Sequence, residues 1–141
     1  MPVLRVCPAV LVALLDDQER VLMIWRHRFV AGRWGWELPG GDVADGEDLD
    51  QTAARELEDL TGYRAGELER LTTFQPMAGI ADAERILFVG RDSQRIAEPV
   101  SSDGPLRAEW IPLNSLQGLV NDGQIWDASS IVGLFGVLMS T

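Results

Sequence analysis

The sequence contains no lysine, one histidine and one cysteine, and each scarcity removes a class of function. All twelve basic residues are arginines, which excludes Schiff-base chemistry and the lysine-containing phosphate loops of many nucleotide-binding proteins. Cys7 has no partner for an intramolecular disulfide or a paired-cysteine metal site. His27 alone cannot build a metal site with several histidine ligands. The single free thiol favours a reducing compartment, and we expect a cytoplasmic protein.

The chain also lacks a hydrophobic run long enough to cross a membrane. Its longest run, residues 9–15, is far shorter than the roughly 20 residues that a membrane-spanning helix needs. Positive charge is scarce as well, because 22 acidic residues outnumber 12 basic ones and the formal net charge is -10. Such a field repels the phosphates of DNA and RNA. We therefore expect no membrane partner and no nucleic-acid partner.

Apart from these gaps, the composition is that of an ordinary globular protein. Hydrophobic residues make up 46% of the 141 residues and charged residues 24%, which argues against disorder and fibrous repeats. A chain of this length can bury one compact core. Because no repeat or linker-like segment divides it, residues 1–141 are expected to form a single domain.

Strand-like and helical segments alternate along the chain. Apolar runs bounded by turn residues predict strands at residues 6–15, 21–25, 68–74, 85–89 and 106–111, and a short strand at 36–38 inside a glycine-rich stretch. Helices are predicted at residues 48–60, 113–120 and 127–139. The first of these helices can be capped by Asp45 or a residue just after it, and Gly62 stands where a helix should end. The order of elements predicts a mixed α/β fold.

The chemically informative segment is a glycine loop that leads into an acidic helix. Three residues are almost one helical turn, so Glu56 and Asp59 lie about 60° apart on one helix face. Two carboxylates on one face suit a hard divalent cation such as Mg²⁺ or Mn²⁺. Arg55, four residues before Asp59, can hold that carboxylate by a charge-assisted hydrogen bond. The plain alternative is an acidic, solvated helix behind a glycine turn.

Residues 41–63 resemble the Nudix box of the Nudix hydrolase family, Gx5Ex7REUxEExGU, in which U is a bulky aliphatic residue. The positions that match it are Gly41, Glu47, Arg55, Glu56, Leu57 and Gly62. Asp59 replaces the first glutamate of the EE pair, Leu60 replaces the second, and Tyr63 occupies the last aliphatic position. The second glutamate is commonly a metal ligand in the family, whereas leucine cannot coordinate a metal.

The resemblance implies a fold and a reaction. The fold is a Nudix-type α/β/α sandwich around a central mixed sheet, and the reaction is Mg²⁺-dependent hydrolysis of a pyrophosphate bond, with Mn²⁺ as an alternative ion. Glu56, Asp59 and the Gly40 carbonyl would hold the metal. Glu47 and Arg55 would orient the catalytic site, and Asp103 is the candidate for a remote catalytic carboxylate, with Glu98 as second choice.

Segments outside the box resemble the ADP-ribose pyrophosphatase branch of the family. They are residues 25–29, which are similar to its Q-Y-R segment, 36–41 (W-E-L-P-A-G), 74–86 (P-x-P-G-x-x-x-E) and 122–128 (D-G-x-I-x-D-A). This similarity implies a nucleoside diphosphate linked to another moiety as substrate, such as ADP-ribose or a nucleotide sugar. The candidate substrate-binding residues are Arg26, Arg28, Glu37 and Glu84. The resemblance also allows a homodimer.

Two of these assignments have structural alternatives. Leu60 continues an apolar stripe with Leu49, Ala53 and Leu57, so it can simply extend the buried face of the helix. Its presence also favours a second interpretation, a catalytically weak Nudix domain that binds a nucleotide or a protein partner. Arginines at a strand end, such as Arg26, can clamp a pyrophosphate or can be merely solvated.

Overall fold

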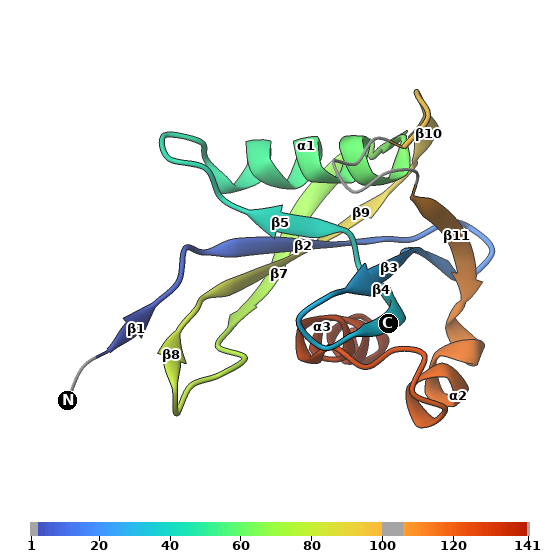
Figure 1. The fold of residues 1–141 in the computed structure, drawn as a ribbon. Helices are drawn as coiled ribbons and strands as arrows, with labels where there is room; N and C mark the ends of the chain where they lie inside the picture. Colours follow the sequence, from blue (N-terminus) through green and yellow to red (C-terminus); the bar gives the residue numbers. More distant parts are fainter. Residues whose placement is uncertain (1–2, 100–105, 141) are drawn as a thin grey trace.

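The computed structural model describes residues 3–99 and 106–140, and two β-sheets form its centre (Figure 1). The first sheet has the order β5-β2-β9-β7, with β2 at Ala9–Leu14, β5 at Gly40–Asp42, β7 at Glu67–Phe74 and β9 at Arg85–Arg91. In this sheet β2 and β9 run parallel, and the other pairs are antiparallel. The second sheet is antiparallel, with the order β11-β3-β4 and the strands Arg107–Pro112, Arg20–Arg28 and Arg33–Glu37.

Two further pairs of two-residue strands lie outside the two main sheets. β1 (Leu4–Arg5) pairs in parallel with β8 (Ala81–Asp82), and β6 (Tyr63–Arg64) pairs antiparallel with β10 (Gln94–Arg95). The helices are α1 (Leu49–Thr61), α2 (Leu116–Asn121) and α3 (Ala128–Met139), and a 3₁₀ turn at Leu113–Ser115 precedes α2. Figure 1 shows α1 on one side of β2 and α3 on the other, so the layers form the α/β/α sandwich expected from the sequence.

Strand β2 is apolar along its whole length because helices cover both faces of its sheet. Its residues alternate between two apolar clusters, since successive side chains of a strand point to opposite faces. Val10 and Val12 pack in the cluster that includes Leu57 of α1. Leu11 and Ala13 belong to the other cluster, which extends to α3. A strand buried on both faces loses the alternating polar pattern of a half-exposed strand.

Helix α1 begins and ends at local sequence signals. The Asp48 side chain accepts a hydrogen bond from the Gln51 backbone N–H at 2.7 Å, which caps the first turn. Gly62 adopts a left-handed conformation, with φ of 76°, and its N–H bonds the Glu58 carbonyl. These two caps fix the length of the helix that carries Glu56.

The structure shifts several boundaries that the sequence analysis placed elsewhere. The first long strand begins at Ala9 rather than at residue 6, and the segment predicted as a helix at 113–120 opens as a 3₁₀ turn. Strand β5 was not predicted, because its Gly40-Gly41-Asp42 sequence has low intrinsic strand preference and depends on pairing with β2. In the part of the chain that the structure describes, no helix is both long enough and apolar enough to span a membrane.

Candidate active site

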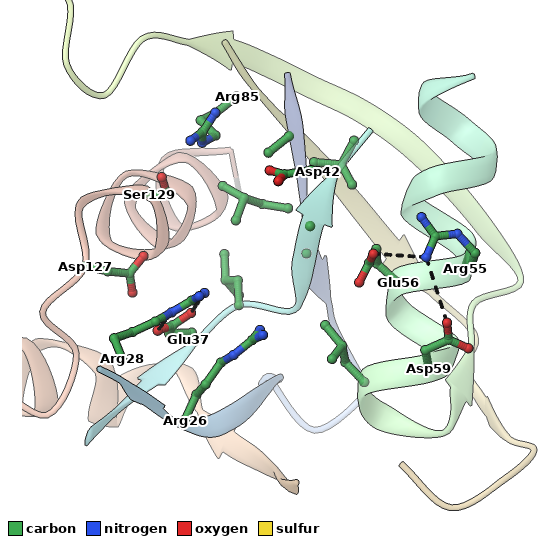
Figure 2. Close-up of a pocket in the computed structure, with 17 residues that line it drawn as sticks. Arg26, Arg28, Glu37, Asp42, Arg55, Glu56, Asp59, Arg85, Asp127 and Ser129 are labelled. Atoms are coloured by element: carbon green, nitrogen blue, oxygen red, sulfur yellow. Dashed lines mark hydrogen bonds and ion pairs between the residues drawn. The ribbon is translucent and has the colours of Figure 1, made fainter. Parts of the chain in front are cut away.

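A cavity of about 650 Å³ lies where the edge of the first sheet meets α1, the β3–β4 hairpin and the start of α3 (Figure 2). Strand β5 crosses it, so the cavity has one side towards α1 and another towards α3. The polar residues that line it are Arg26, Arg28, Glu37, Asp42, Arg55, Glu56, Asp59, Arg85, Asp127 and Ser129. This set combines guanidinium groups, which attract anions, with carboxylates, which attract cations.

Glu56 occupies the centre of the α1 side and lies against the glycine loop. A Cβ atom on Gly41 would stand 2.6 Å from the Glu56 carboxylate, so only glycine allows this close approach. The Glu56 side chain is 18% exposed, and its burial raises the pKa of the carboxyl group above its ordinary value. A nearby cation would stabilise the ionised form of such a partly desolvated carboxylate.

Arg55 and Glu47 form a bidentate pair behind Glu56. Arg55 Nε and Nη2 each donate to a Glu47 oxygen at 2.9 Å, and the Thr52 hydroxyl donates to Glu47 at 2.7 Å. The hydrogen bonds from Arg55 are the largest cause that lowers the pKa of Glu47 to about 2. The remaining Arg55 nitrogen, Nη1, donates to Glu56 Oε1 at 3.1 Å. Glu47 therefore acts through Arg55, which orients Glu56.

The other two positions of interest on α1 are an acid and a leucine. Asp59 is more exposed than Glu56, and its Oδ2 lies 3.9 Å from Arg55 Nη1. Figure 2 shows the Arg55 guanidinium between these two carboxylates. Leu60 is only 6% exposed and lines the cavity, yet it belongs to neither apolar cluster. The side chain at position 60 therefore forms an apolar part of the cavity wall.

The oxygen donors on this side fit a hard divalent cation. Glu56 and Asp59 supply two carboxylates, and Gly40, whose backbone carbonyl is a further candidate ligand, lines the same cavity. Within residues 3–99 and 106–140, no group of three His, Cys, Asp or Glu residues forms a ready-made metal cage. Mg²⁺ characteristically keeps several waters and takes one or two protein carboxylates together with substrate phosphates. The donors present match that pattern.

Strands β3 and β4 contribute arginines to the cavity. Arg28 Nε and Nη2 donate to the two oxygens of Glu37 at 2.9 and 2.7 Å, and the Glu37 side chain is only 6% exposed. Arg26 lies nearer to Glu56 and helps to lower the pKa of that carboxyl group, against the larger effect of burial. Among the described residues Arg26 makes no hydrogen bond or ion pair, which leaves its guanidinium available to an anion.

Four polar lining residues were missed by the sequence analysis: Asp42, Arg85, Asp127 and Ser129. Asp127 caps α3, because its Oδ2 accepts a hydrogen bond from the Ser130 N–H at 3.0 Å. Its Oδ1 is buried and has no hydrogen-bond partner within residues 3–99 and 106–140. Burial, followed by the nearby Glu37 carboxylate, raises the pKa of Asp127. The D-A pair at residues 127–128 was noted as a motif, but its acid was not assigned to the site.

Three residues named from the sequence do not line the cavity. Glu84 is exposed, and it is the following residue, Arg85, that faces the cavity. Glu98, the second choice for a remote carboxylate, is exposed and pairs with Arg95. Glu47 stands behind Arg55 rather than in the lining. Asp103, the first choice for the remote carboxylate, lies outside the described residues.

The comparisons with known proteins identify the family in which an acidic helix packs behind a glycine strand in this way. The NUDIX domain family model matches residues 6–131. A CMP-5'-(N-acetyl-N-hydroxy-3-aminopropyl)phosphonate hydrolase of Streptomyces rubellomurinus is 38% identical over 130 residues, which cover 92% of this chain and 63% of that protein. An ADP-ribose pyrophosphatase of Mycobacterium tuberculosis is 29% identical over 133 residues, covering 92% of this chain and 64% of that protein.

A solved structure, the crystal structure of an ADP compounds hydrolase, superimposes with a TM-score of 0.84 at 20% identity and covers 94% of this chain and 71% of that chain. The chain belongs to the Nudix family. The predicted resemblance to the ADP-ribose pyrophosphatase branch is also confirmed, since a curated member of that branch matches over most of the chain. The chain spans a little under two thirds of the length of the two curated relatives described above.

Proposed function

We propose that this chain hydrolyses the pyrophosphate bond of a nucleoside diphosphate linked to another moiety, with Mg²⁺ or Mn²⁺ as its cofactor. The observation that carries the proposal is the Glu56 carboxylate, which is partly desolvated against Gly41 and faces the cavity beside Asp59. The relatives named as a CMP-linked phosphonate hydrolase and an ADP-ribose pyrophosphatase support the substrate class. Both names describe a nucleotide joined through phosphorus to a second group.

The reaction needs a water molecule and a positioned diphosphate. The water oxygen forms a new bond to one phosphorus, the bridging P–O bond breaks, and the products are a nucleoside monophosphate, the phosphorylated second moiety and a released proton. Glu56, Asp59 and the Gly40 carbonyl are the groups that would hold the divalent cation. The chemistry supplied by a bound cation is positive charge against the diphosphate and Lewis acidity.

Other side chains of the cavity would bind the phosphates, orient Glu56 and form the wall beside the substrate. The guanidinium of Arg26, which makes no hydrogen bond with the described residues, can donate to two phosphate oxygens. Arg55 and Glu47 keep Glu56 at a fixed distance from the glycine strand. The Arg28–Glu37 pair, joined by two hydrogen bonds, forms a polar wall on the other side of the cavity, where it can contact the substrate.

The direct test is a hydrolysis screen of the purified chain with Mg²⁺, with Mn²⁺ and with chelator. The substrates are ADP-ribose, a nucleoside diphosphate sugar, a dinucleoside polyphosphate and a nucleoside triphosphate. We expect metal-dependent release of a nucleoside monophosphate, fastest from ADP-ribose or a nucleoside diphosphate sugar. A triphosphate preferred by tenfold or more in kcat/KM, about 1.4 kcal/mol of transition-state stabilisation, would assign the chain to another branch.

Leu60 favours a second candidate function, a catalytically weak domain that binds a nucleotide or a protein partner. Leucine at this position places an apolar side chain on the cavity wall and offers no ligand to a metal. Calorimetry with a nucleoside diphosphate and Mg²⁺ separates the two candidates. Tight nucleotide binding without turnover of any of the substrates supports the binding domain.

A further inference from the structure

Three lining residues on adjacent strands, Asp42, Ala9 and Arg85, form one part of the α3 side of the cavity, which we call the notch. Ala9 of β2 pairs with Asp42 of β5 on one side and with Arg85 of β9 on the other. These three residues therefore form one row across the sheet, and their side chains point to the same face. Gly41, the neighbour of Asp42, faces Glu56 on the α1 side, so Asp42 points away from the metal-binding carboxylates. Figure 2 shows Asp42, Arg85 and Ser129 on this α3 side.

The two walls of the notch carry opposite charges that do not neutralise each other directly. Two strand spacings place the Cα atoms of Asp42 and Arg85 about 10 Å apart, and only the methyl group of Ala9 lies between them. Arg85 uses Nη1 to donate to the Ala83 and Glu84 carbonyls at 3.2 and 3.1 Å, and its other nitrogens have no partner among the described residues. Over the same ranges, the side chains of Asp42 and Ser129 make no hydrogen bond.

The charge arrangement limits what the notch can hold. An anion attracted by Arg85 would be repelled by Asp42, and a cation would meet the reverse conflict. A neutral group that both donates and accepts hydrogen bonds satisfies both walls, because its donors reach the carboxylate while its acceptors reach the guanidinium. Hydroxyl groups on a sugar ring have this double character. Ala9 is the smallest side chain of the row, and the cavity as a whole, at about 650 Å³, has room for a sugar ring.

We propose that the notch formed by Asp42, Ala9 and Arg85 binds a neutral, polyhydroxylated ring of the substrate, away from the bond that is hydrolysed. This inference rests on the proposed function, because it assigns the place of one part of that substrate. It makes Asp42 and Arg85 the residues that select the second moiety. Ala9 sets the size of the ring that the cavity accepts.

The test compares ADP-ribose with the methyl ester of ADP, which keeps the diphosphate but has no second ring. Arg85→Ala and Asp42→Ala should each lower kcat/KM for ADP-ribose about tenfold, the loss expected for a hydrogen bond to a charged group, and change the methyl ester less than twofold. Ala9→Leu should fill the notch and have the same selective effect. Arg91→Ala removes an arginine from the far end of β9, outside this cavity, and should affect neither substrate.

A second pair of substrates tests the charge argument. ADP-glucose should be hydrolysed faster than its uronic acid counterpart, and Arg85→Ala should not reverse that order. A preference for the acidic sugar that Arg85→Ala abolishes would overturn the proposal and identify an anion site instead. Equal losses on ADP-ribose and on the methyl ester would also overturn it, while leaving the hydrolase function intact.

Binding measurements keep the two proposals separable. Suppose that neither substrate is hydrolysed, that ADP-ribose binds more tightly than the methyl ester, and that Arg85→Ala or Ala9→Leu removes that difference. The notch proposal is then supported, and the proposed hydrolase function is overturned. If neither ADP-ribose nor any nucleoside diphosphate sugar binds or reacts, both proposals are overturned. Thermal unfolding of each variant identifies a fold defect in Ala9→Leu, in which case the exposed Asp42 and the partly buried Arg85 provide the decisive variants.

Discussion

Two arginine–glutamate pairs flank the same cavity, and they differ in how much water reaches them. In the Arg55–Glu47 pair the glutamate is 20% exposed, whereas in the Arg28–Glu37 pair it is 6% exposed. Both pairs have two short hydrogen bonds, so their geometry is nearly the same. The first pair contacts the Glu56 carboxylate through Arg55, and the second pair forms part of the cavity wall. We therefore expect the first pair to matter more for activity and the second pair to matter more for stability.

The largest expected effect concerns the carboxylate that the first pair orients. Glu56→Gln removes the negative charge that would hold the cation, and we expect a loss of kcat of at least about 100-fold. Because burial penalises the charged Glu56, the amide should unfold at the same temperature as the parent or slightly above it. Steady-state kinetics and thermal unfolding in chelator check the two parts. Unchanged Mg²⁺ affinity by calorimetry, together with retained activity, would contradict this placement of the metal site.

The second expected effect is a difference in the free energy of unfolding between variants of the two arginine–glutamate pairs. Arg28→Ala leaves the buried Glu37 carboxylate without its bidentate partner, and we expect a loss of about 3 kcal/mol in the free energy of unfolding. Arg55→Ala is the matched variant and should be clearly less destabilising, because Glu47 can be solvated. Chemical denaturation of both variants gives the comparison. Equal losses would show that exposure does not distinguish the pairs.

The third effect concerns the apolar wall beside the acidic helix. Leu60→Glu places a carboxylate about 40° around the helix from Glu56 and removes a buried leucine, so we expect about 2 kcal/mol lower stability in chelator. Mg²⁺ should then raise the unfolding temperature of this variant more than that of the parent, because the ion binds only the folded state. An equal Mg²⁺ shift in both proteins would mean that the side chain at position 60 does not reach the metal.

The smallest effect is a difference in pH dependence between two carboxyl groups. Glu47 has a pKa lowered from 4.5 to about 2, so its stabilisation is complete above pH 4.5 and is lost as the pH falls towards 2. Asp127 has a raised pKa, so its ionisation costs stability at neutral pH, and that cost disappears as the pH falls through its folded pKa towards 3.8. Glu47→Gln should therefore be less stable than the parent at pH 7.

Asp127→Asn serves as the counterpart in this experiment. Asparagine can still cap α3 and carries no charge, so this variant should match or exceed the parent at pH 7 and lose that advantage on acidification. Urea denaturation at several pH values between 7 and 3 measures both trends. Parallel pH profiles for the two variants would show that the environments of the two acids do not differ in this way.

The sequence predicted what depends on neighbours in the chain. Helix α1 could be placed because its stop, Gly62, is local, and because the helical spacing fixes which residues share a face. Glu56 and Asp59 could be paired for the same reason. Strand β5 and the short pairings of β1, β6, β8 and β10 could not be predicted, since their few residues become strands only through partners elsewhere.

The residues on the α3 side of the cavity were harder to predict from the sequence, because their positions also depend on distant partners. Arg85 faces the cavity and Glu84 does not, and this depends on the register of β9 against β2, which sequence spacing does not encode. A shift of one residue would exchange the two side chains. Asp127 carries a visible signal, a helix cap after a turn, but its role at the cavity depends on where α3 docks.

The parallel pairing of β2 with β9 also has a consequence for the order in which the molecule assembles. Residues about seventy-five positions apart must meet before the Asp42–Ala9–Arg85 row exists, and residues 127–129 must follow before the α3 side is closed. Closing such long loops costs chain entropy that only later contacts offset. Helix α1 and its Arg55–Glu47 pair can form early from local contacts. During synthesis, therefore, the residues of the acidic helix and its caps are all available once residue 62 is made, whereas the lining of the cavity is complete only after residue 129.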